Sequence, residues 1–186
     1  MSAVSTMTTD QLLAIPDDGL ERELIRGELR ERPMTRRNRL HAATEARIAQ
    51  ILLNWLERSP QVAADVLSGE AGAILAQQPD TTVGIDIAVF SLETLRGQTD
   101  ESRYVVGIPL LAVEILSPTD KHEEIHEKIM EYQRVGVPLT WEVDPDFRTV
   151  RVHQLGQEPV MFNRQQSLRA EPVLPGFETP VSAFFP

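Results

Sequence analysis

The hydrophobic residues of the chain recur with two periods, one typical of helices and the other typical of strands. Between about Arg37 and Glu57, apolar side chains fall on one face of a helix. These side chains are Ile48, Ile51, Leu52, Trp55 and Leu56. Toward the N-terminus the same stripe becomes polar at Glu45, Thr44 and His41. We therefore expect a cleft to open beside the first turns of this helix.

Short apolar segments after this helix predict strands. They cover residues 62–67, 71–77, 84–90 and 103–116, and residues 139–143 and 149–155 add two more. The segment 103–116 ends in a run that is apolar on both faces. Such a run is typical of a strand at the centre of a covered sheet.

A second helix is expected between these two groups of strands. Asp120 and Glu123 have the spacing of a capping box at its start, and Gly136 and Pro138 end it. One face of this helix carries Ile125, Lys128, Ile129 and Tyr132. A lysine therefore lies on its apolar side.

The two ends of the chain predict smaller elements. Thr8 or Thr9 can cap a short helix, and residues 20–34 predict a β-hairpin that turns at residues 26–27. Residues 171–186 are rich in proline, and we expect their phenylalanines to pack on the body of the protein. No repeat, low-complexity block or linker is found, so we expect a single α/β domain with helices on the faces of a sheet.

Two carboxylates lie inside apolar segments. Glu114 stands between Val113 and Ile115, and Asp86 lies in the run GIDIAVF. An ionised side chain is costly to bury unless it is paired or coordinates a metal. The structural alternatives are an ion pair or an exposed strand end for Glu114, and a loop cap for Asp86. Asp80 competes with Asp86, but the TTVG segment that follows Asp80 is typical of a turn.

Lys128 and the first helix supply further candidates. A lysine at the edge of an apolar face usually extends its amine to solvent, but Lys128 closely follows the strand that carries Glu114. Two strand-borne carboxylates and one inward lysine suit a metal-dependent hydrolytic site. Glu45 and His41 can reach a metal, a bridging water or each other; the alternative is an ordinary i,i+4 pair at a helix start.

The composition narrows the chemistry. The chain contains no cysteine, which excludes disulfides, thiolate metal sites and a cysteine nucleophile. Carboxylates and four histidines remain as ligands, which favours hard cations such as Mg²⁺ or Mn²⁺. His122 and His126 lack the HExxH pattern and a third ligand, so we interpret them as a solvated helix face. Ser117 lacks a GxSxG context, and neither a P-loop nor GxGxxG is present.

The net charge of −10 at pH 7 argues against tight, non-specific DNA binding by the monomer, because nucleic-acid binders usually carry a basic face. A basic cluster of Arg36, Arg37 and Arg39 keeps DNA binding open. The N-terminus lacks the regions of a signal peptide, and no apolar stretch approaches membrane-spanning length. We expect a cytoplasmic protein with no membrane partner.

Several of these segments resemble a known family. LLAVEILSPTD and EKIMEYQRVGVPLTWEVDP are similar to the restriction-endonuclease family often called the Uma-type domain, within the PD-(D/E)xK nuclease-like superfamily. The hairpin LERELIRGELRERPM, the helix RLHAATEARIAQIL, GIDIAVF and PGFETPVSAFF extend the resemblance over nearly the whole chain. It implies one restriction-endonuclease-like domain over residues 1–186. This domain would have a central mixed β-sheet flanked by helices and an N-terminal β-hairpin extension.

The resemblance also implies roles for individual residues. Asp86 and Glu114 would be metal ligands, with the Ile115 carbonyl as a third. The usual lysine position, two residues after the acidic residue, is Leu116 here, and Lys128 matches the branch whose lysine has moved to the next helix. Glu45 would match a helix glutamate that completes some of these sites.

The pattern departs from the family at two places. Ile85 stands where a proline usually precedes the motif aspartate, and Thr140 begins a strand segment that is usually richer in aromatic residues. Neither departure removes a proposed catalytic residue.

The implied activity is hydrolysis of DNA phosphodiester bonds by an Mg²⁺- or Mn²⁺-dependent endonuclease. Two alternatives stay open. One is a catalytically degenerate nuclease fold that serves as a binding or regulatory module, which the acidic charge and the displaced lysine favour. The other is a metal-dependent hydrolase of a smaller phosphate substrate, which needs no basic groove. Edge strands and the apolar C-terminal tail are consistent with a homodimer, which would suit cleavage of two DNA strands.

Overall fold

A mixed β-sheet runs through the molecule. The computed structural model describes residues 6–34, 38–99, 102–118 and 120–186. The strands of the sheet are β1 (Leu20–Ile25), β2 (Glu28–Pro33), β3 (Ala64–Ala76), β4 (Thr81–Ser91), β5 (Val105–Val106), β6 (Leu111–Ile115), β7 (Leu139–Asp144), β8 (Thr149–Gln154) and β9 (Val160–Asn163). Their order is β2-β1-β4-β6-β7-β8-β9, with β3 paired to β4 and β5 paired to β3. Strands β6 and β7 run parallel, whereas β4 is antiparallel to both β3 and β6.

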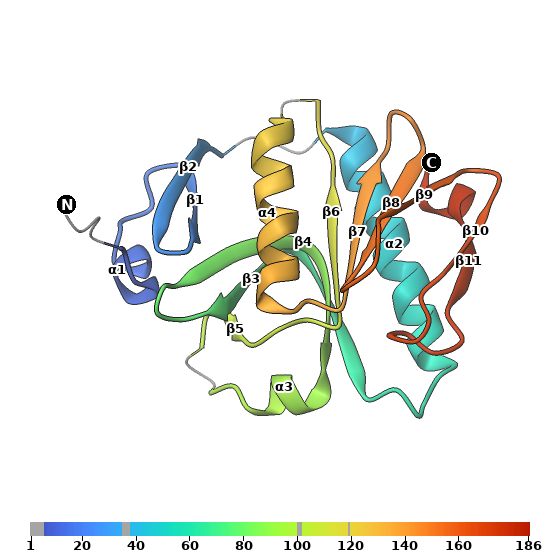
Figure 1. Ribbon diagram of the computed structural model, residues 1–186, viewed down its shortest axis with the longest axis horizontal. Coiled ribbons are helices and arrows are strands. Elements are labelled where there is room, and N and C mark those ends of the chain that lie inside the picture. The colour runs from blue at the N-terminus through green and yellow to red at the C-terminus, as the bar shows by residue number, and fades with distance from the viewer. Residues whose placement is uncertain (1–5, 35–37, 100–101, 119) are drawn as a thin grey trace.

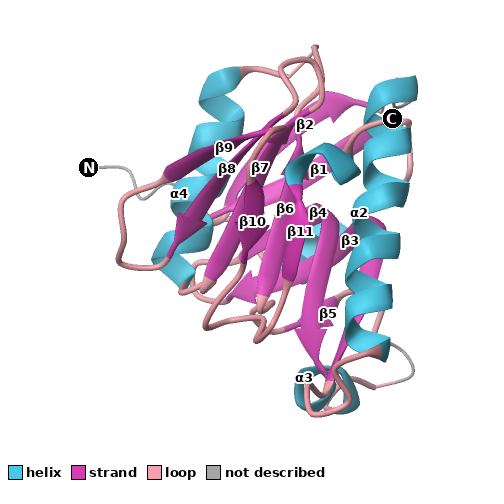
Figure 2. Cartoon of the chain, turned by 90° about the vertical axis from the view of Figure 1, so that its right-hand side faces the viewer, coloured by secondary structure: helices cyan, strands magenta, loops and turns pink. Residues whose placement is uncertain are grey.

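Two long helices cover opposite faces of this sheet. They are α2 (Arg39–Glu57) and α4 (His122–Val135), and Figures 1 and 2 show the strands between them. The smaller elements are α1 (Thr9–Leu13), α3 (Leu92–Arg96), the 3₁₀ helix η1 (Val181–Phe184), and a separate pair of strands, β10 (Ser167–Arg169) and β11 (Glu178–Pro180). Across the described ranges, no helix is both long and apolar enough to span a lipid bilayer.

The face of the sheet under α2 carries the larger hydrophobic cluster. Ile48, Leu52 and Trp55 of α2 belong to it, together with side chains from the C-terminal segment. The ring of Trp141 on β7 lies 5.4 Å from that of Phe177 and 5.6 Å from that of Phe184, measured between centroids. The prediction that the C-terminal phenylalanines pack on the body of the protein is therefore confirmed.

The opposite face, under α4, receives Glu114, the charged residue of β6. Because side chains alternate along a strand, Val113 and Ile115 belong to the α2 cluster, whereas Ala112 belongs to the cluster that contains Tyr132 of α4. Glu114 has the same parity as Ala112, so it points toward α4. This alternation brings Glu114 to the helix that carries Lys128.

The predicted hairpin and both long helices are confirmed, with small shifts at their ends. Strands β1 and β2 are joined at Arg26 and Gly27, which both have positive φ. Thr8 caps α1, and Asn38 caps α2 by accepting a hydrogen bond from the His41 N–H. Of the predicted basic cluster, Arg39 begins α2, whereas Arg36 and Arg37 lie outside the described residues.

The strand boundaries needed three corrections. Residues 62–67 and 71–77 were predicted as separate pieces, but they belong to the single strand β3, whose bulge at Gly69 and Glu70 breaks its register without ending it. The TTVG segment after Asp80 begins β4 and is not a turn, because its residues pair with β3. Residues 103–116 form two strands, since Gly107, at φ +144°, and Pro109 separate β5 from β6.

The predicted capping box at the start of α4 was wrong. Lys121 occupies the N-cap position and makes no side-chain capping bond. The Asp120 carboxylate instead accepts a hydrogen bond from the Ser117 N–H at 2.8 Å. Asp120 therefore closes the turn before the helix, which leaves its side chain at the edge of the cleft described below.

Candidate active site

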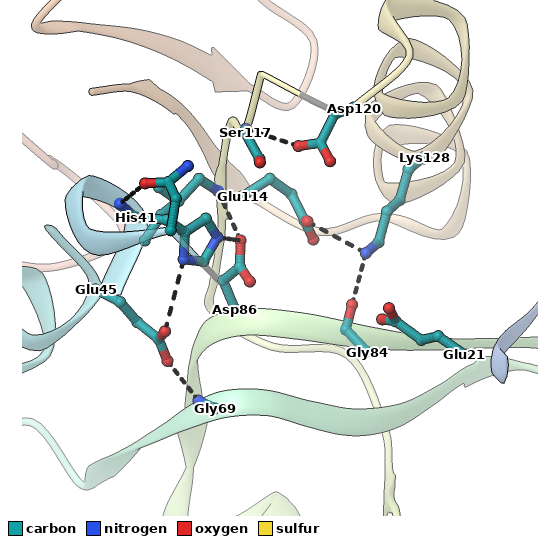
Figure 3. Close-up of polar contacts among 12 residues, drawn as sticks. Glu21, His41, Glu45, Gly69, Gly84, Asp86, Glu114, Ser117, Asp120 and Lys128 are labelled. Atoms are coloured by element: carbon teal, nitrogen blue, oxygen red, sulfur yellow. Dashed lines mark hydrogen bonds and ion pairs between the residues drawn. The ribbon is translucent and has the colours of Figure 1, made fainter. Parts of the chain in front are cut away.

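The site lies where two central strands separate. The ladder between β4 and β6 ends at the pair Ile87 and Val113. Beyond this pair, the Asp86 side chain replaces the missing ladder bond by accepting from the Ile115 N–H at 2.7 Å. Asp86 and Glu114 therefore stand at the point where the strands part (Figure 3). The residue expected to offer a backbone carbonyl, Ile115, lies beside Asp86.

Lys128 reaches this point from α4. Its side chain is only 7% exposed, so it does not extend to solvent. Its Nζ donates to the Gly84 carbonyl at 2.6 Å and to Glu114 Oε2 at 3.2 Å. The structure thus brings Asp86, Glu114 and Lys128 together from β4, β6 and α4.

Glu114 is held in an environment that disfavours its charge. Burial raises its pKa to about 7, and the Asp86 carboxylate raises it further, while the Lys128 ammonium and a hydrogen bond from the Tyr132 hydroxyl act in the other direction. The Tyr132 hydroxyl donates to Glu114 Oε1 at 2.5 Å. Glu114 therefore exchanges a proton near neutral pH.

Asp86 is buried as well, but its pKa moves in the opposite direction. Burial disfavours its charge, yet the His41 ring, the Ile115 N–H and the Lys128 ammonium together hold the pKa of Asp86 below its ordinary value. Neighbouring carboxylates whose pKa values are pushed apart are typical of acid–base sites. Asp86 is the charged member of this pair at neutral pH.

His41 and Glu45 of α2 lie next to Asp86, with the His41 ring in contact with both carboxylates. The His41 Nε2 atom lies 3.3 Å from Asp86 Oδ2, and its Nδ1 atom lies 3.9 Å from Glu45 Oε2. Glu45 Oε1 also accepts from the Gly69 N–H at 2.7 Å, at the bulge of β3. The structure therefore separates Glu45 from Asp86 by the imidazole ring, and the polar start of α2 does face the site.

The competing candidates lie elsewhere. The Asp80 carboxylate accepts from the backbone N–H groups of Thr9 and Gln78, which ties α1 to the start of β4. His122 and His126 are exposed on α4, as expected of a solvated helix face. Asp80 therefore does not line the cleft that contains Asp86.

Two residues of the hairpin enter the site without having been predicted there. Glu23 on β1 lies 3.0 Å from Lys128 Nζ. Arg32 on β2 pairs with Glu21 at 2.6 Å and lines the cleft above Asp86 and Glu114. In the segment LERELI, the spacing of Glu21 and Glu23 predicts only that both side chains lie on one face of a strand. It could not show which helix that face would meet.

A cleft covers these residues and continues into a groove. The cleft contains about 270 Å³ of space over Asp86, Glu114 and Lys128, including open solvent. The adjoining groove lies between the hairpin and α4 and contains about 600 Å³ of space, again including open solvent. Cleft and groove share four lining residues, Arg32, Asp120, Ile125 and Lys128. Cleft and groove therefore form one continuous depression that narrows toward the carboxylates.

Comparison with known proteins assigns the chain to a family. A family model described as "Putative restriction endonuclease", Uma2, matches residues 9–182. The chain belongs to the Uma2 family. The crystal structure of "a putative nuclease belonging to DUF820" from Anabaena variabilis matches it with a TM-score of 0.78 and 21% identity, over 96% of this chain and 97% of that one. Curated proteins give no match. The predicted family and fold are confirmed.

The donor set of this Uma2 chain fits a hard divalent cation. Within the described ranges, no three histidine, cysteine, aspartate or glutamate side chains are grouped as metal ligands. Mg²⁺, however, keeps several waters and usually needs only one or two carboxylates. Asp86 and Glu114 provide two, and their mutual repulsion contributes to the raised pKa of Glu114. A divalent cation held by these residues would relieve that repulsion.

Proposed function

We propose that this Uma2 protein is a nuclease that hydrolyses DNA phosphodiester bonds with the help of Mg²⁺ or Mn²⁺. The observation that supports it most directly is the convergence of Asp86, Glu114 and Lys128 at the floor of one cleft. Phosphoryl transfer requires mainly positioning and stabilisation of charge from the protein. Two carboxylates and one ammonium supply both, and the family description agrees with this chemistry.

The carboxylates would hold the cation. Asp86 is the permanent anion, and Glu114 would lose its proton when the cation binds, with the Ile115 carbonyl as a further ligand. Such a cation, when bound, lowers the pKa of a water and polarises a phosphoryl oxygen. Glu45 would act through His41, by fixing the ring that contacts Asp86.

Lys128 would supply fixed positive charge. Burial alone would lower its pKa, but the carboxylates of Glu114, Glu23 and Asp86 raise it above the ordinary value. The ammonium therefore stays protonated at neutral pH and is suited to stabilise negative charge that develops on a phosphate. It is not suited to accept a proton from the attacking water.

The acidic charge of the chain makes the lining of the groove important. Arg30, Arg32 and Lys121 line it, and they are the side chains that would contact DNA phosphates. Arg32 also lines the cleft itself. We propose that DNA enters along this groove and that Arg32 contacts the phosphate nearest the carboxylates.

Nicking of supercoiled plasmid in the presence of Mn²⁺ tests the proposal. We expect the wild type to nick and Glu114→Gln to lose nicking, because the substitution removes a proposed ligand. Glu142→Gln is the matched control, since Glu142 is the register partner of Glu114 on β7 and does not line the cleft. Full activity of Glu114→Gln would contradict the assignment.

Calorimetry with Mg²⁺ and Mn²⁺ tests the cation separately. We expect binding by the wild type and loss of binding in Asp86→Asn. A wild type that binds neither cation and does not nick would instead support the degenerate binding or regulatory module.

A smaller phosphate diester is the second candidate substrate. It is favoured by the groove lining, in which acidic residues outnumber basic ones: Glu21, Glu23, Glu31, Asp120, Glu124 and Glu127 against Arg30, Arg32, Lys121 and Lys128. Hydrolysis of bis(p-nitrophenyl) phosphate without any nicking of plasmid, single-stranded or linear DNA would select this candidate.

A further inference from the structure

A carboxylate of the N-terminal hairpin reaches the centre of the site. The Glu23 side chain on β1 is 12% exposed, and its Oε1 atom lies 3.0 Å from Lys128 Nζ. The same ammonium lies slightly farther, 3.2 Å, from Glu114. The hairpin, which the resemblance treats as an extension of the core, therefore supplies the nearer carboxylate.

We propose that Glu23 is a positioning residue that holds the Lys128 ammonium against Glu114, so that the β1–β2 hairpin is part of the catalytic apparatus. The kinetic part of this inference rests on the proposed nuclease function. The structural part, which is the anchoring of Lys128 by Glu23, does not.

The first argument is the number of donors on Lys128. An ammonium has three N–H donors and no acceptor. The Gly84 carbonyl and Glu114 accept hydrogen bonds from this ammonium, and Glu23 Oε1 completes its surroundings as an ion-pair partner at 3.0 Å. A buried donor that loses its partner carries a desolvation penalty. Removal of Glu23 would therefore favour another orientation of the Lys128 side chain.

The second argument is that the Glu23 carboxylate is itself anchored. Strands β1 and β4 pair only at Leu24 and Thr82, so the Gly84 N–H lies beyond their ladder. Glu23 Oε1 accepts from this N–H at 3.0 Å. Glu23, Gly84 and Lys128 therefore close a ring of three contacts. A carboxylate fixed to the backbone can fix an ammonium in turn.

The third argument is that the contacts of Lys128 come from different parts of the sheet. Glu23 is on β1, Gly84 on β4 and Glu114 on β6. A side chain that contacted only β6 could follow small movements of that strand. Contacts with three strands instead fix the Lys128 ammonium in one position. Groups that position catalytic side chains typically change rates by about 10–100-fold when removed.

A double-mutant cycle on plasmid nicking tests the kinetic part. We expect Glu23→Ala to lower kcat by about 10–100-fold with a smaller change in KM, and Glu23→Gln to lower it less, because the amide oxygen still accepts from Lys128. If Glu23 acts through Lys128, Glu23→Ala should have almost no further effect in a Lys128→Met background. Independent, multiplying losses in the two backgrounds would overturn the inference.

Folding and surface charge are controlled in the same experiment. Glu28→Ala removes a carboxylate from the same hairpin, but this side chain is 59% exposed, pairs with Arg30 at 3.1 Å and does not line the groove. We expect its kcat to match the wild type. If Glu23→Ala does not fold, the cycle is run with Glu23→Gln, and it is judged by the same criterion.

A readout without catalysis separates this inference from the proposed function. The sequence contains only two lysines, Lys121 and Lys128, so ¹⁵N-lysine labelling gives two side-chain signals. Lys121 is 75% exposed and serves as the internal reference for rapid exchange. We expect a slowly exchanging Lys128 ammonium signal in the wild type and in Glu28→Ala, and its loss in Glu23→Ala. An unchanged signal would overturn the anchoring, whether or not the protein nicks DNA.

Discussion

At the scale of single residues, the site combines charges that burial would normally exclude. Lys128 neutralises part of the charge of Glu114, and His41 and the Ile115 N–H support Asp86. The two carboxylates therefore differ: the pKa of Asp86 is lowered and that of Glu114 is raised to about 7. This difference has a consequence for stability.

Stability should fall as pH rises through the titration of Glu114. The folded protein holds this proton more tightly than the unfolded chain, because burial raises the pKa from 4.5 to about 7. Its stabilising contribution is present below pH 4.5 and is lost as pH rises through about 7. The shift corresponds to at most about 3 kcal/mol. The lowered pKa of Asp86 lies below this window and does not alter the trend.

Urea unfolding at pH 5 and pH 8 without divalent cations measures this effect. From pH 5 to pH 8, we expect the free energy of unfolding to fall by up to about 3 kcal/mol more in the wild type than in Glu114→Gln. Equal losses would show that Glu114 does not titrate there. Addition of Mg²⁺ at pH 8 should stabilise the wild type, because the proposed cation binds only the folded site.

At the scale of elements, the site depends on how three segments are attached to the sheet. The bulge of β3 presents Gly69 to Glu45, the gap between β4 and β6 accommodates the Asp86 side chain, and the hairpin brings Glu23 to Lys128. Arg30 and Glu127 join the hairpin to α4 through a bidentate pair at 2.7 and 3.2 Å. The hairpin and α4 thus form the two walls of the groove.

Two paired glycines, one on β3 and one on β4, offer a test of how closely side chains pack against these strands. Gly72 and Gly84 are register partners. A Cβ on Gly72 would lie 2.3 Å from the Tyr104 ring, whereas a Cβ on Gly84 would meet nothing closer than 3.5 Å. We expect Gly72→Ala to lose about 1–3 kcal/mol of unfolding free energy, and Gly84→Ala to lose clearly less in the same urea titration. The reverse order would contradict this account.

At the scale of the whole molecule, the C-terminal segment closes the core. Phe184 is fully buried against Trp141, and Phe177 packs against both Trp55 and Trp141. The tail therefore belongs to the same hydrophobic cluster as α2 and is not an appendage. Its phenylalanines are consequently not available to a second copy of the chain.

Truncation of one phenylalanine measures the contribution of the tail. We expect Phe184→Ala to lower the free energy of unfolding by about 3–5 kcal/mol, because it leaves a cavity beside Trp141. Phe147→Ala is the matched control, since its ring is 81% exposed. Similar unfolding midpoints for the two variants would contradict the role of the tail in the core.

Association of two copies remains a prediction. Because the phenylalanines of the C-terminal segment are buried, the surface we now consider for it is the edge strand β9. Strand β9 ends the strand order, and Val160 and Met161 on it are 53% and 52% exposed. Apolar side chains on an edge strand favour pairing with another chain. We expect a dimer by light scattering and a monomer after Met161→Lys. A wild-type monomer at high concentration would exclude this contact.

Local sequence patterns were sufficient to predict the main elements and the ionisable residues inside them. Helical spacing predicted α2 and α4, and apolar runs located β4 and β6, because these patterns follow from local geometry. The same patterns identified Asp86, Glu114 and Lys128, since an ionisable residue in an apolar setting is costly without a partner. The strand breaks at Gly69 and Gly107 were misjudged, because pairing with other strands decides whether an irregular residue ends a strand.

Which of these residues contact one another depends on how the elements pack in the folded protein. The separation of β4 from β6, the imidazole between Glu45 and Asp86, and the contact of Glu23 with Lys128 join segments far apart in the chain. Alternation along β1 predicts that Glu21 and Glu23 lie on the same face of the strand. It does not predict which helix covers that face. Contacts of this kind arise from the packing of whole elements. The contact between Glu23 and Lys128 could therefore be found only in the folded molecule.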